Sequence, residues 1–221
     1  MSSKDASREV VLVAHSNAGL FVPAVMASLS HRVRAAVFVD AALPAHAEES
    51  PMASAEVLEQ LADLADEDDL LPPWTDWFPK SEMAALFPDE RTRRRVCAEQ
   101  PRLPLSYFKE SVPVSLGWDT GRCGYIAFSP AYERLAAEAV EHGWLVRWLP
   151  GGHLHQLVDP VAVTEAIVEV STWTLDVIQS SVPPPTRGSR ASSAPLSAAG
   201  TRSPASRRGR SVRCSRPGAP A

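Results

Sequence analysis

The sequence contains few cysteines and no long apolar run. Its three cysteines, Cys97, Cys123 and Cys214, are odd in number and lack C-x-x-C or Cys/His ligand spacing, so neither a disulfide framework nor a zinc site is indicated and we expect free thiols. No stretch resembles a membrane span. Because no charged n-region followed by an apolar h-region opens the chain, the cytoplasm is the default expectation for its location.

Acidic residues are missing from the C-terminal stretch. All 26 acidic residues lie at or before Asp176, whereas eight of the 22 basic residues follow it. The acidic character of the chain up to Asp176 argues against nucleic acid as the main partner, because contacts with phosphate groups supply most of the affinity for nucleic acids. Residues 180–221 are almost entirely Ser, Pro, Ala, Gly, Arg and Thr, which predicts a disordered basic tail after a single domain over residues 1–179. Such a tail either binds anionic surfaces weakly or is solvated with no role.

The organising feature of the domain is a strand followed by a sharp turn and a helix. Val10–Val13 is too short and too rich in β-branched residues for a helix, and it predicts a strand that is buried on both faces. Apolar residues from Gly19 to about Ser30 fit one face of a helix. The turn therefore lies at Ser16, within a G-x-S-x-G-like pattern that has alanine in place of both glycines.

A serine at such a turn has two interpretations. In one, Ser16 is a strained, exposed nucleophile, and the small residues Ala14 and Ala18 allow the close approach that the turn requires. In the other, Ser16 only caps the helix of an ordinary α/β protein.

A second buried strand is predicted at Val33–Val39 and ends at Asp40. A strand, helix and strand in this order form a right-handed parallel unit, so the fold class is α/β with a mostly parallel sheet. Ligands gather at the carboxyl ends of parallel strands. Ser16 and Asp40 are therefore expected at the same edge of the sheet.

Residues 45–120 break the strand-helix pattern and predict a helical lid over the strand ends. Its aromatic residues either line an apolar pocket or only hold the lid together. Helices are expected over 54–70, 80–87, 89–100 and 105–112, and the candidate substrate-binding residues are Trp74, Trp77, Phe78 and Tyr107, with Phe108 beside them.

The pattern of strands and helices resumes after the lid. A strand is expected over 123–128, a helix over 131–142, a strand over 144–149 and a final helix from Asp159 to about Gln179, with Asp159 as its N-cap. The loop Pro150-Gly-Gly-His-Leu-His155 places His153 after the carboxyl end of the last strand. His155 is a pocket or helix-capping candidate, His15 is expected to point away from Ser16, and His31, His46 and His142 are expected on the surface.

From Val10 to about Ser171 the chain resembles the carboxyl-terminal part of an α/β-hydrolase, with the elbow at Ser16, the strand end at Asp40 and the Gly-Gly-His loop in the order of that family's triad. The resemblance implies an esterase-like serine hydrolase without cofactor or metal, acting through an acyl-enzyme. Ser16 is the implied nucleophile, His153 the base, Asp40 the orienting acid and the Asn17 N–H an oxyanion donor. Glu133 is the alternative acid, and Asp40 would then only form a turn before Pro44.

In that family further strands precede the elbow strand, together with the loop that supplies the second oxyanion N–H, and the resemblance does not extend to them. The expectation is a truncated copy, a mispredicted start or a fragment that needs a partner, with an unpaired apolar strand edge. Three functions stay open: a serine esterase for a small apolar ester-like substrate, a catalytically impaired remnant, and a lyase or perhydrolase on the same fold. The oligomeric state is not predicted.

Overall fold

The computed structural model describes residues 9–29, 32–120 and 123–181. Four parallel strands form the central sheet in the order β1-β2-β5-β6. They are β1 (Val10–Ser16), β2 (Val33–Ala41), β5 (Cys123–Ala127) and β6 (Leu145–Trp148). The predicted parallel α/β sheet is confirmed, and the parallel pairing puts the ends of β1 and β2 at one edge.

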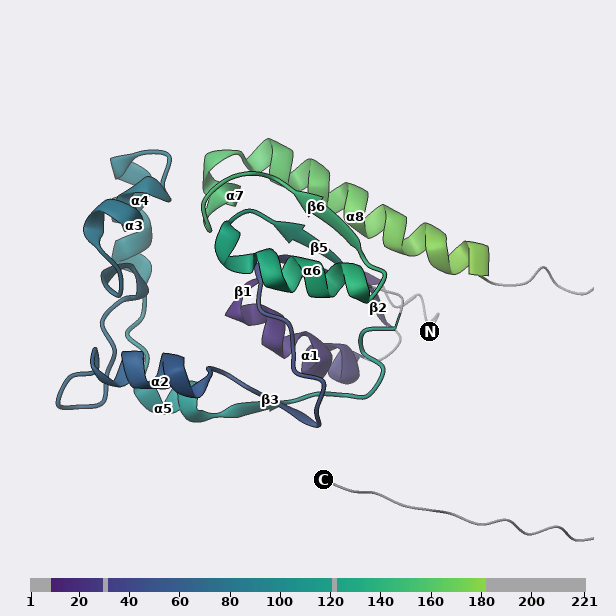
Figure 1. Ribbon diagram of the computed structural model, residues 1–221. Coiled ribbons are helices and arrows are strands. Elements are labelled where there is room, and N and C mark those ends of the chain that lie inside the picture. The colour runs from purple at the N-terminus through teal and green to yellow at the C-terminus, as the bar shows by residue number, and fades with distance from the viewer. Residues whose placement is uncertain (1–8, 30–31, 121–122, 182–221) are drawn as a thin grey trace, which may run out of the picture. The chain divides into compact units, whose positions relative to one another are not determined.

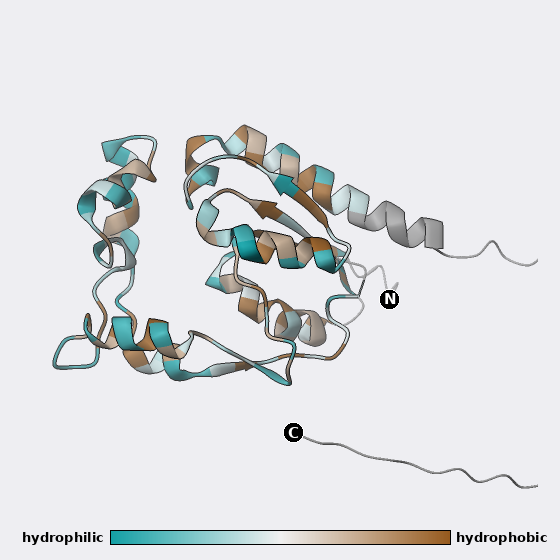
Figure 2. Cartoon of the chain, viewed as in Figure 1, coloured by the Kyte–Doolittle hydropathy of each residue, from teal (hydrophilic) through white to brown (hydrophobic). Residues whose placement is uncertain are grey.

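Helices cover both faces of this sheet (Figure 1). Successive side chains of β2 point to opposite faces of the sheet, so the strand contributes to a hydrophobic core on each face. Ala36 and Phe38 pack with α6 (Glu133–Glu141). Val37 and Val39 pack with α8 (Pro160–Ser181) on the other face. The short helices α1 (Val22–Leu29) and α7 (His155–Val158) complete this part of the chain. In Figure 2 the strand β5 is coloured as hydrophobic, whereas the flanking helices α6 and α8 carry both hydrophobic and hydrophilic residues.

The expected burial of Val10–Val13 on both faces is wrong. Val10, Val11 and Val13 expose 37%, 38% and 50% of their surface. The reason is strand order, because β1 pairs with β2 on one side only and lies at the edge of the described sheet.

Residues 45–120 form a separate segment, which we call the excursion. It contains β3 (Glu49–Pro51), α2 (Ala55–Ala62), α3 (Lys80–Ala85), α4 (Glu90–Glu99), α5 (Leu105–Lys109) and β4 (Ser111–Pro113). Two predicted helices are corrected. The helix expected over 54–70 ends at Ala62, and the one expected over 105–112 stops at Lys109 because the next residues pair as β4 with β3.

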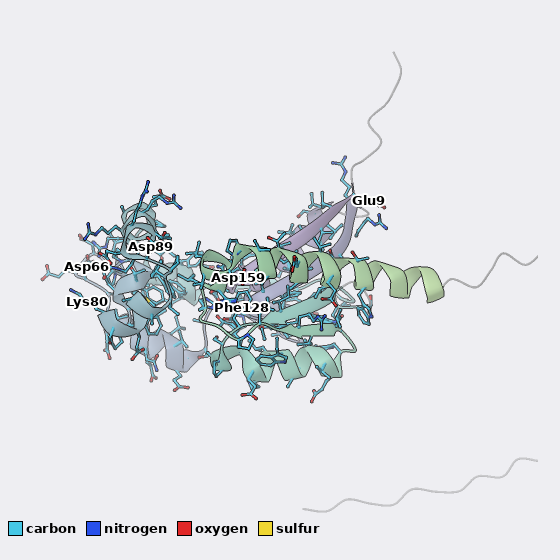
Figure 3. All side chains as sticks on the ribbon, turned by 90° about the horizontal axis from the view of Figure 1, so that it is seen from above. Glu9, Asp66, Lys80, Asp89, Phe128 and Asp159 are labelled. Carbon is cyan, nitrogen blue, oxygen red and sulfur yellow. The ribbon has the colours of Figure 1, made fainter. Side chains whose placement is uncertain are left out.

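The excursion has its own small core, in which Leu61, Leu71, Leu105 and Phe108 are buried. The β3–β4 ribbon connects it to the helix after the elbow, since Met52 and Val112 pack against Leu20. Charged side chains such as Asp66, Lys80 and Asp89 project from this segment (Figure 3).

The remaining predicted elements are found with small shifts. The helix expected over 131–142 begins as a 3-10 turn at Pro130–Tyr132 and continues as α6. Asp159 caps α8 as predicted, because its Oδ1 accepts from the Ala162 N–H at 3.0 Å. Within the described ranges, no helix has the length and hydropathy needed to cross a membrane. The predicted tail lies outside the described residues, apart from Ser180 and Ser181 at the end of α8.

Candidate active site

The turn after β1 holds Ser16 in a strained backbone conformation. Ser16 has φ 58° and ψ −136°, a region that L residues rarely adopt, and a 3-10 turn begins at the next residue, Asn17. Such a conformation costs about 1–3 kcal/mol and persists only where the surrounding structure enforces it. Because Asn17 is the first residue of a helical turn, its N–H has no acceptor within that turn.

The surrounding structure enforces the turn through close packing at Gly19. A Cβ atom at this position would lie 2.0 Å from the carbonyl oxygen of Ala42, so no side chain fits there. Ala14 is buried as expected, whereas Ala18 is exposed. The sequence predicted a close approach at Ala14 and Ala18, and the structure shows one at Gly19, the residue after Ala18.

A β-bulge at the end of β2 positions Asp40. His15 pairs with Val39 and Ser16 pairs with Ala41, so Asp40 has no partner in β1, and its φ is 41°. The Tyr125 hydroxyl holds the next residue, donating to the Ala41 carbonyl at 2.7 Å and accepting from its N–H at 3.1 Å. Bulges re-aim side chains next to functional sites. Here the bulge presents the Asp40 carboxylate at the carboxyl end of the sheet.

The Asp40 carboxylate is fully buried and has four hydrogen-bond donors. Oδ1 accepts from the N–H groups of Phe128 and Ser129 at 2.9 and 3.2 Å. Oδ2 accepts from the Ser129 hydroxyl at 2.9 Å and from His153 Nδ1 at 2.7 Å. Burial raises the pKa of Asp40, but these hydrogen bonds, that of His153 foremost, outweigh it and hold the pKa below its ordinary value. The carboxylate is therefore ionised at neutral pH and fixes Nδ1 of His153 as a donor.

His15 supports the loop that carries His153. Its Nε2 lies 2.8 Å from the His153 carbonyl oxygen, and since that oxygen can only accept, Nε2 carries the proton. The two imidazole rings are 4.5 Å apart. Burial and then the neighbouring His153 lower the pKa of His15, so it is neutral at physiological pH. The sequence suggested no role for His15, because its contact with residue 153 depends on the folded loop.

Tyr132 contacts both Ser16 and His153. Its ring stacks on the His153 imidazole with 5.1 Å between centroids and 1° between planes. The Ser16 hydroxyl beside the Tyr132 hydroxyl lowers the pKa of Tyr132, but burial outweighs it and raises that pKa overall. No hydrogen bond joins Ser16 to His153 among the described residues. In enzymes without substrate this contact is often long, and it tightens when substrate binds.

A cavity of about 710 Å³ opens beside the elbow. Ser16 and Asn17 reach its wall from the sheet, and the excursion contributes Trp74, Trp77, Tyr107 and Phe108. Phe78 does not line it. That side chain is 47% exposed, and its ring lies 6.1 Å from that of Trp74, which does line the cavity. The cavity is mainly apolar and aromatic, with the serine at one end.

The alternative acid, Glu133, lies at the exposed start of α6 and has no contact with His153 among the interactions of the described residues. Cys97 and Cys123 are free thiols as expected, and Cys214 lies outside the described residues. Burial raises the pKa of Cys123 to about 12, which removes it as a thiolate nucleophile.

The sheet, the serine elbow and the Asp40–His153 pair at its carboxyl edge together define the α/β-hydrolase fold. Solved structures agree on this fold. The chain resembles an extracellular α/β-hydrolase from a Paenibacillus species that is described as sharing homology with tobacco salicylic acid binding protein 2 (TM-score 0.55, 16% identity, 74% of this chain and 72% of that chain).

Two further structures are similar. One is a variant of tomato methylketone synthase I in complex with β-ketoheptanoate (TM-score 0.56, 12% identity, 78% of this chain and 74% of that chain). The other is polyneuridine aldehyde esterase (TM-score 0.51, 17% identity, 76% of this chain and 74% of that chain). No protein-family model and no curated protein matches the sequence. The likeness establishes the fold and leaves the reaction to be argued from the site.

Proposed function

We propose that this chain is a serine hydrolase that cleaves an ester or related acyl bond through an acyl-enzyme on Ser16. The observation that carries the proposal is the 2.7 Å hydrogen bond from His153 Nδ1 to the buried Asp40 carboxylate, beside a serine held at a strained elbow. An aspartate in this position keeps the imidazole in the tautomer whose Nε2 can accept a proton.

Each step of the reaction has a group in this site. His153 Nε2 takes the proton from the Ser16 hydroxyl as its oxygen attacks the substrate carbonyl, and the Asn17 N–H donates to the oxyanion that forms. The resulting imidazolium returns the proton to the departing alcohol. Water then repeats the sequence on the acyl-enzyme and releases the acid. Asp40 stays ionised throughout and stabilises the imidazolium charge.

For the first step the Ser16 hydroxyl must turn from Tyr132 toward His153. The Tyr132 hydroxyl lies beside the Ser16 hydroxyl, and its ring stacks on His153 and fixes the plane of the imidazole. We infer that a bound substrate carbonyl displaces the tyrosine contact, so that the serine hydroxyl turns toward His153. The stacking of Tyr132 on His153 is retained in both arrangements.

The substrate class follows from the cavity. Aromatic side chains of the excursion make up one wall, and Trp74 also lies against His153 with 6.0 Å between ring centroids. These contacts favour a small to medium apolar acyl or alcohol group, with the excursion acting as a lid. Among the structural neighbours, tomato methylketone synthase I has been seen with β-ketoheptanoate and with 2-tridecanone, and another neighbour is an esterase.

Two alternatives remain from the same observations. The absence of a hydrogen bond between Ser16 and His153 favours a catalytically impaired member of the fold. The methylketone synthase neighbour favours the other alternative, which is a lyase or perhydrolase on the same fold. Cytoplasmic location stays a prediction, since one neighbour is described as extracellular.

Hydrolysis of p-nitrophenyl esters with acyl chains of two to twelve carbons tests the proposal. We expect turnover that is abolished by Ser16→Ala and by His153→Ala and retained by Glu133→Gln. Rates should rise with chain length until the acyl group fills the cavity. Folded wild-type protein without turnover on any of these esters would favour the impaired or lyase reading, and a substrate panel including β-keto acids separates those two.

A further inference from the structure

Three side chains that could bind a metal ion, His46, Asp119 and His142, lie close together outside the triad, and Glu138 lies beside His46. His46 follows β2, Asp119 precedes β5, and Glu138 and His142 lie one turn apart at the end of α6. Ligand atoms of His46, Asp119 and His142 all lie within 4.8 Å of one another. Glu138 Oε1 lies 3.6 Å from His46 Nε2, and Asp119 Oδ2 lies 3.7 Å from His142 Nδ1.

The donor set is that of a transition-metal site. Two imidazole nitrogens and two carboxylate oxygens suit zinc better than magnesium or calcium, which prefer oxygen alone. With metal-ligand bonds of about 2.0–2.2 Å, neighbouring ligand atoms of a tetrahedral site lie roughly 3.4 Å apart. Both pairs above are within a few tenths of an ångström of that spacing. The side chain of His46 is 59% exposed, so it can rotate inward to close the remaining gap.

The backbone around the site is fixed before any ion binds. The His142 N–H donates to the Glu138 carbonyl at 3.1 Å, and Gly143, with φ 75°, ends the helix there. The ring of Trp144 stacks on His142 at 5.3 Å, while its Nε1 donates to the Asp119 carbonyl at 3.3 Å. A preformed arrangement of this kind reduces the ordering entropy that binding would otherwise cost.

The charges around the site also favour a cation. The last carbonyl groups of α6 carry the negative end of the helix dipole toward His142. Among the described residues, Arg134 pairs with Glu138 Oε2 at 3.4 Å, which leaves Oε1 directed at His46.

We propose that His46, Asp119, Glu138 and His142 bind one divalent cation of the zinc class. The consequence is mechanical, since His46 lies at the start of the excursion and Asp119 at its end. One ion would fasten both ends of the excursion to α6. The same helix supplies Arg134 and Leu135 to the cavity wall, so the ion would also fix the base of the substrate pocket.

Isothermal titration calorimetry of the full-length, metal-free chain with zinc chloride tests this, using protein without a polyhistidine tag. We expect one site per chain, and a loss of affinity of at least 100-fold in the double variant His46→Ala/His142→Ala. Glu141→Gln is the matched control, because it removes an exposed carboxylate on the same helix and should leave binding unchanged. Magnesium chloride should give no binding heat.

His153→Ala separates this site from the histidine pair at the active site, and it should bind zinc as the wild type does. At free zinc 100-fold above the dissociation constant, the melting temperature of wild type should rise by about 5–10 °C and that of the double variant should not. Comparable melting curves of the metal-free variants show that both are folded. Absence of zinc binding by wild type up to 1 mM, roughly the weak limit of specific sites, or equal binding by the double variant, overturns the proposal.

Discussion

Replacing Asp40 by asparagine separates the orienting carboxylate from the shape of the site. Asparagine tolerates the left-handed backbone that residue 40 adopts, with φ 41°, and it has nearly the size of aspartate. Its orientation is decided by the two N–H groups of Phe128 and Ser129, which need an oxygen acceptor. Turning the amide the other way would leave both N–H groups unsatisfied, at a cost of about 2–6 kcal/mol.

The amide NH₂ of this variant therefore faces Nδ1 of His153 and the Ser129 hydroxyl. The Ser129 hydroxyl can rotate to accept, but the imidazole can accept only if its proton moves to Nε2, where it blocks proton transfer from Ser16. The same substitution in a Ser-His-Asp triad lowers kcat about 10⁴-fold, and we expect a loss of that order here.

The assay is kcat/KM on a p-nitrophenyl ester, with the melting temperature measured in parallel. Glu133→Gln is the matched control, since it neutralises the other candidate acid and should leave kcat/KM within about twofold of wild type. Activity of Asp40→Asn within tenfold of wild type, in a protein with an unchanged melting curve, would refute the assignment. A greater loss in the control would transfer the role to Glu133.

Three further predictions follow from the geometry of the elbow. Gly19→Ala should destabilise the fold by more than about 3 kcal/mol in urea unfolding, because its Cβ would meet the Ala42 carbonyl oxygen at 2.0 Å; a smaller change contradicts the tight turn. Tyr132→Phe keeps the ring that stacks on His153 but removes the hydroxyl beside Ser16. Because the serine hydroxyl then turns toward His153 without losing that contact, kcat/KM should rise about 2- to 13-fold, the value of one neutral hydrogen bond, and unchanged kinetics would contradict this. The folded state lowers the pKa of His15, so the free energy of unfolding, measured by denaturant titration, should fall as the pH drops below about 6.5, the pKa of this group in the unfolded chain. The variant His15→Gln should lose this pH dependence. A variant whose stability changes with pH as steeply as that of wild type would contradict the prediction.

The elbow and the parallel sheet could be predicted because their signals are local. A short β-branched run, Ser16 and then Gly19 within a few residues specify the strand, the turn and the helix that follows. The buried run Val33–Val39 and the final helix were equally clear from periodicity and from Asp159 as a cap. These features depend on residues that are neighbours along the chain.

What the sequence could not predict depends on pairing between distant segments. The bulge that orients Asp40 exists because β2 has one extra residue, Asp40, between the partners of His15 and Ser16 in β1. Ser111–Pro113 has no strand pattern of its own and becomes extended by pairing with Glu49–Pro51. The exposed valines of β1 likewise reflect strand order, which no periodicity in Val10–Val13 encodes.

The same limit applies to the side-chain clusters. No sequence pattern assigns a role to Tyr132, because only folding places its ring on His153. The histidines and carboxylates of the proposed cation site come from three separate segments of the chain, and only Glu138 and His142 are one helical turn apart, which explains why no metal was expected. Phe78 is one residue from Trp77 in the sequence, yet it is 47% exposed and is not part of the cavity wall, a difference that sequence spacing does not encode.

Covalent labelling by a fluorophosphonate tests the central claim most directly, because it needs only an activated serine and no knowledge of the substrate. We expect wild-type protein to gain one adduct, located on Ser16 by peptide mass spectrometry, with Ser16→Ala unlabelled and both His153→Ala and Asp40→Asn labelled far more slowly. Absence of an adduct on folded wild type, or labelling of Ser16→Ala to the same extent, would contradict the account of Ser16 as an activated nucleophile.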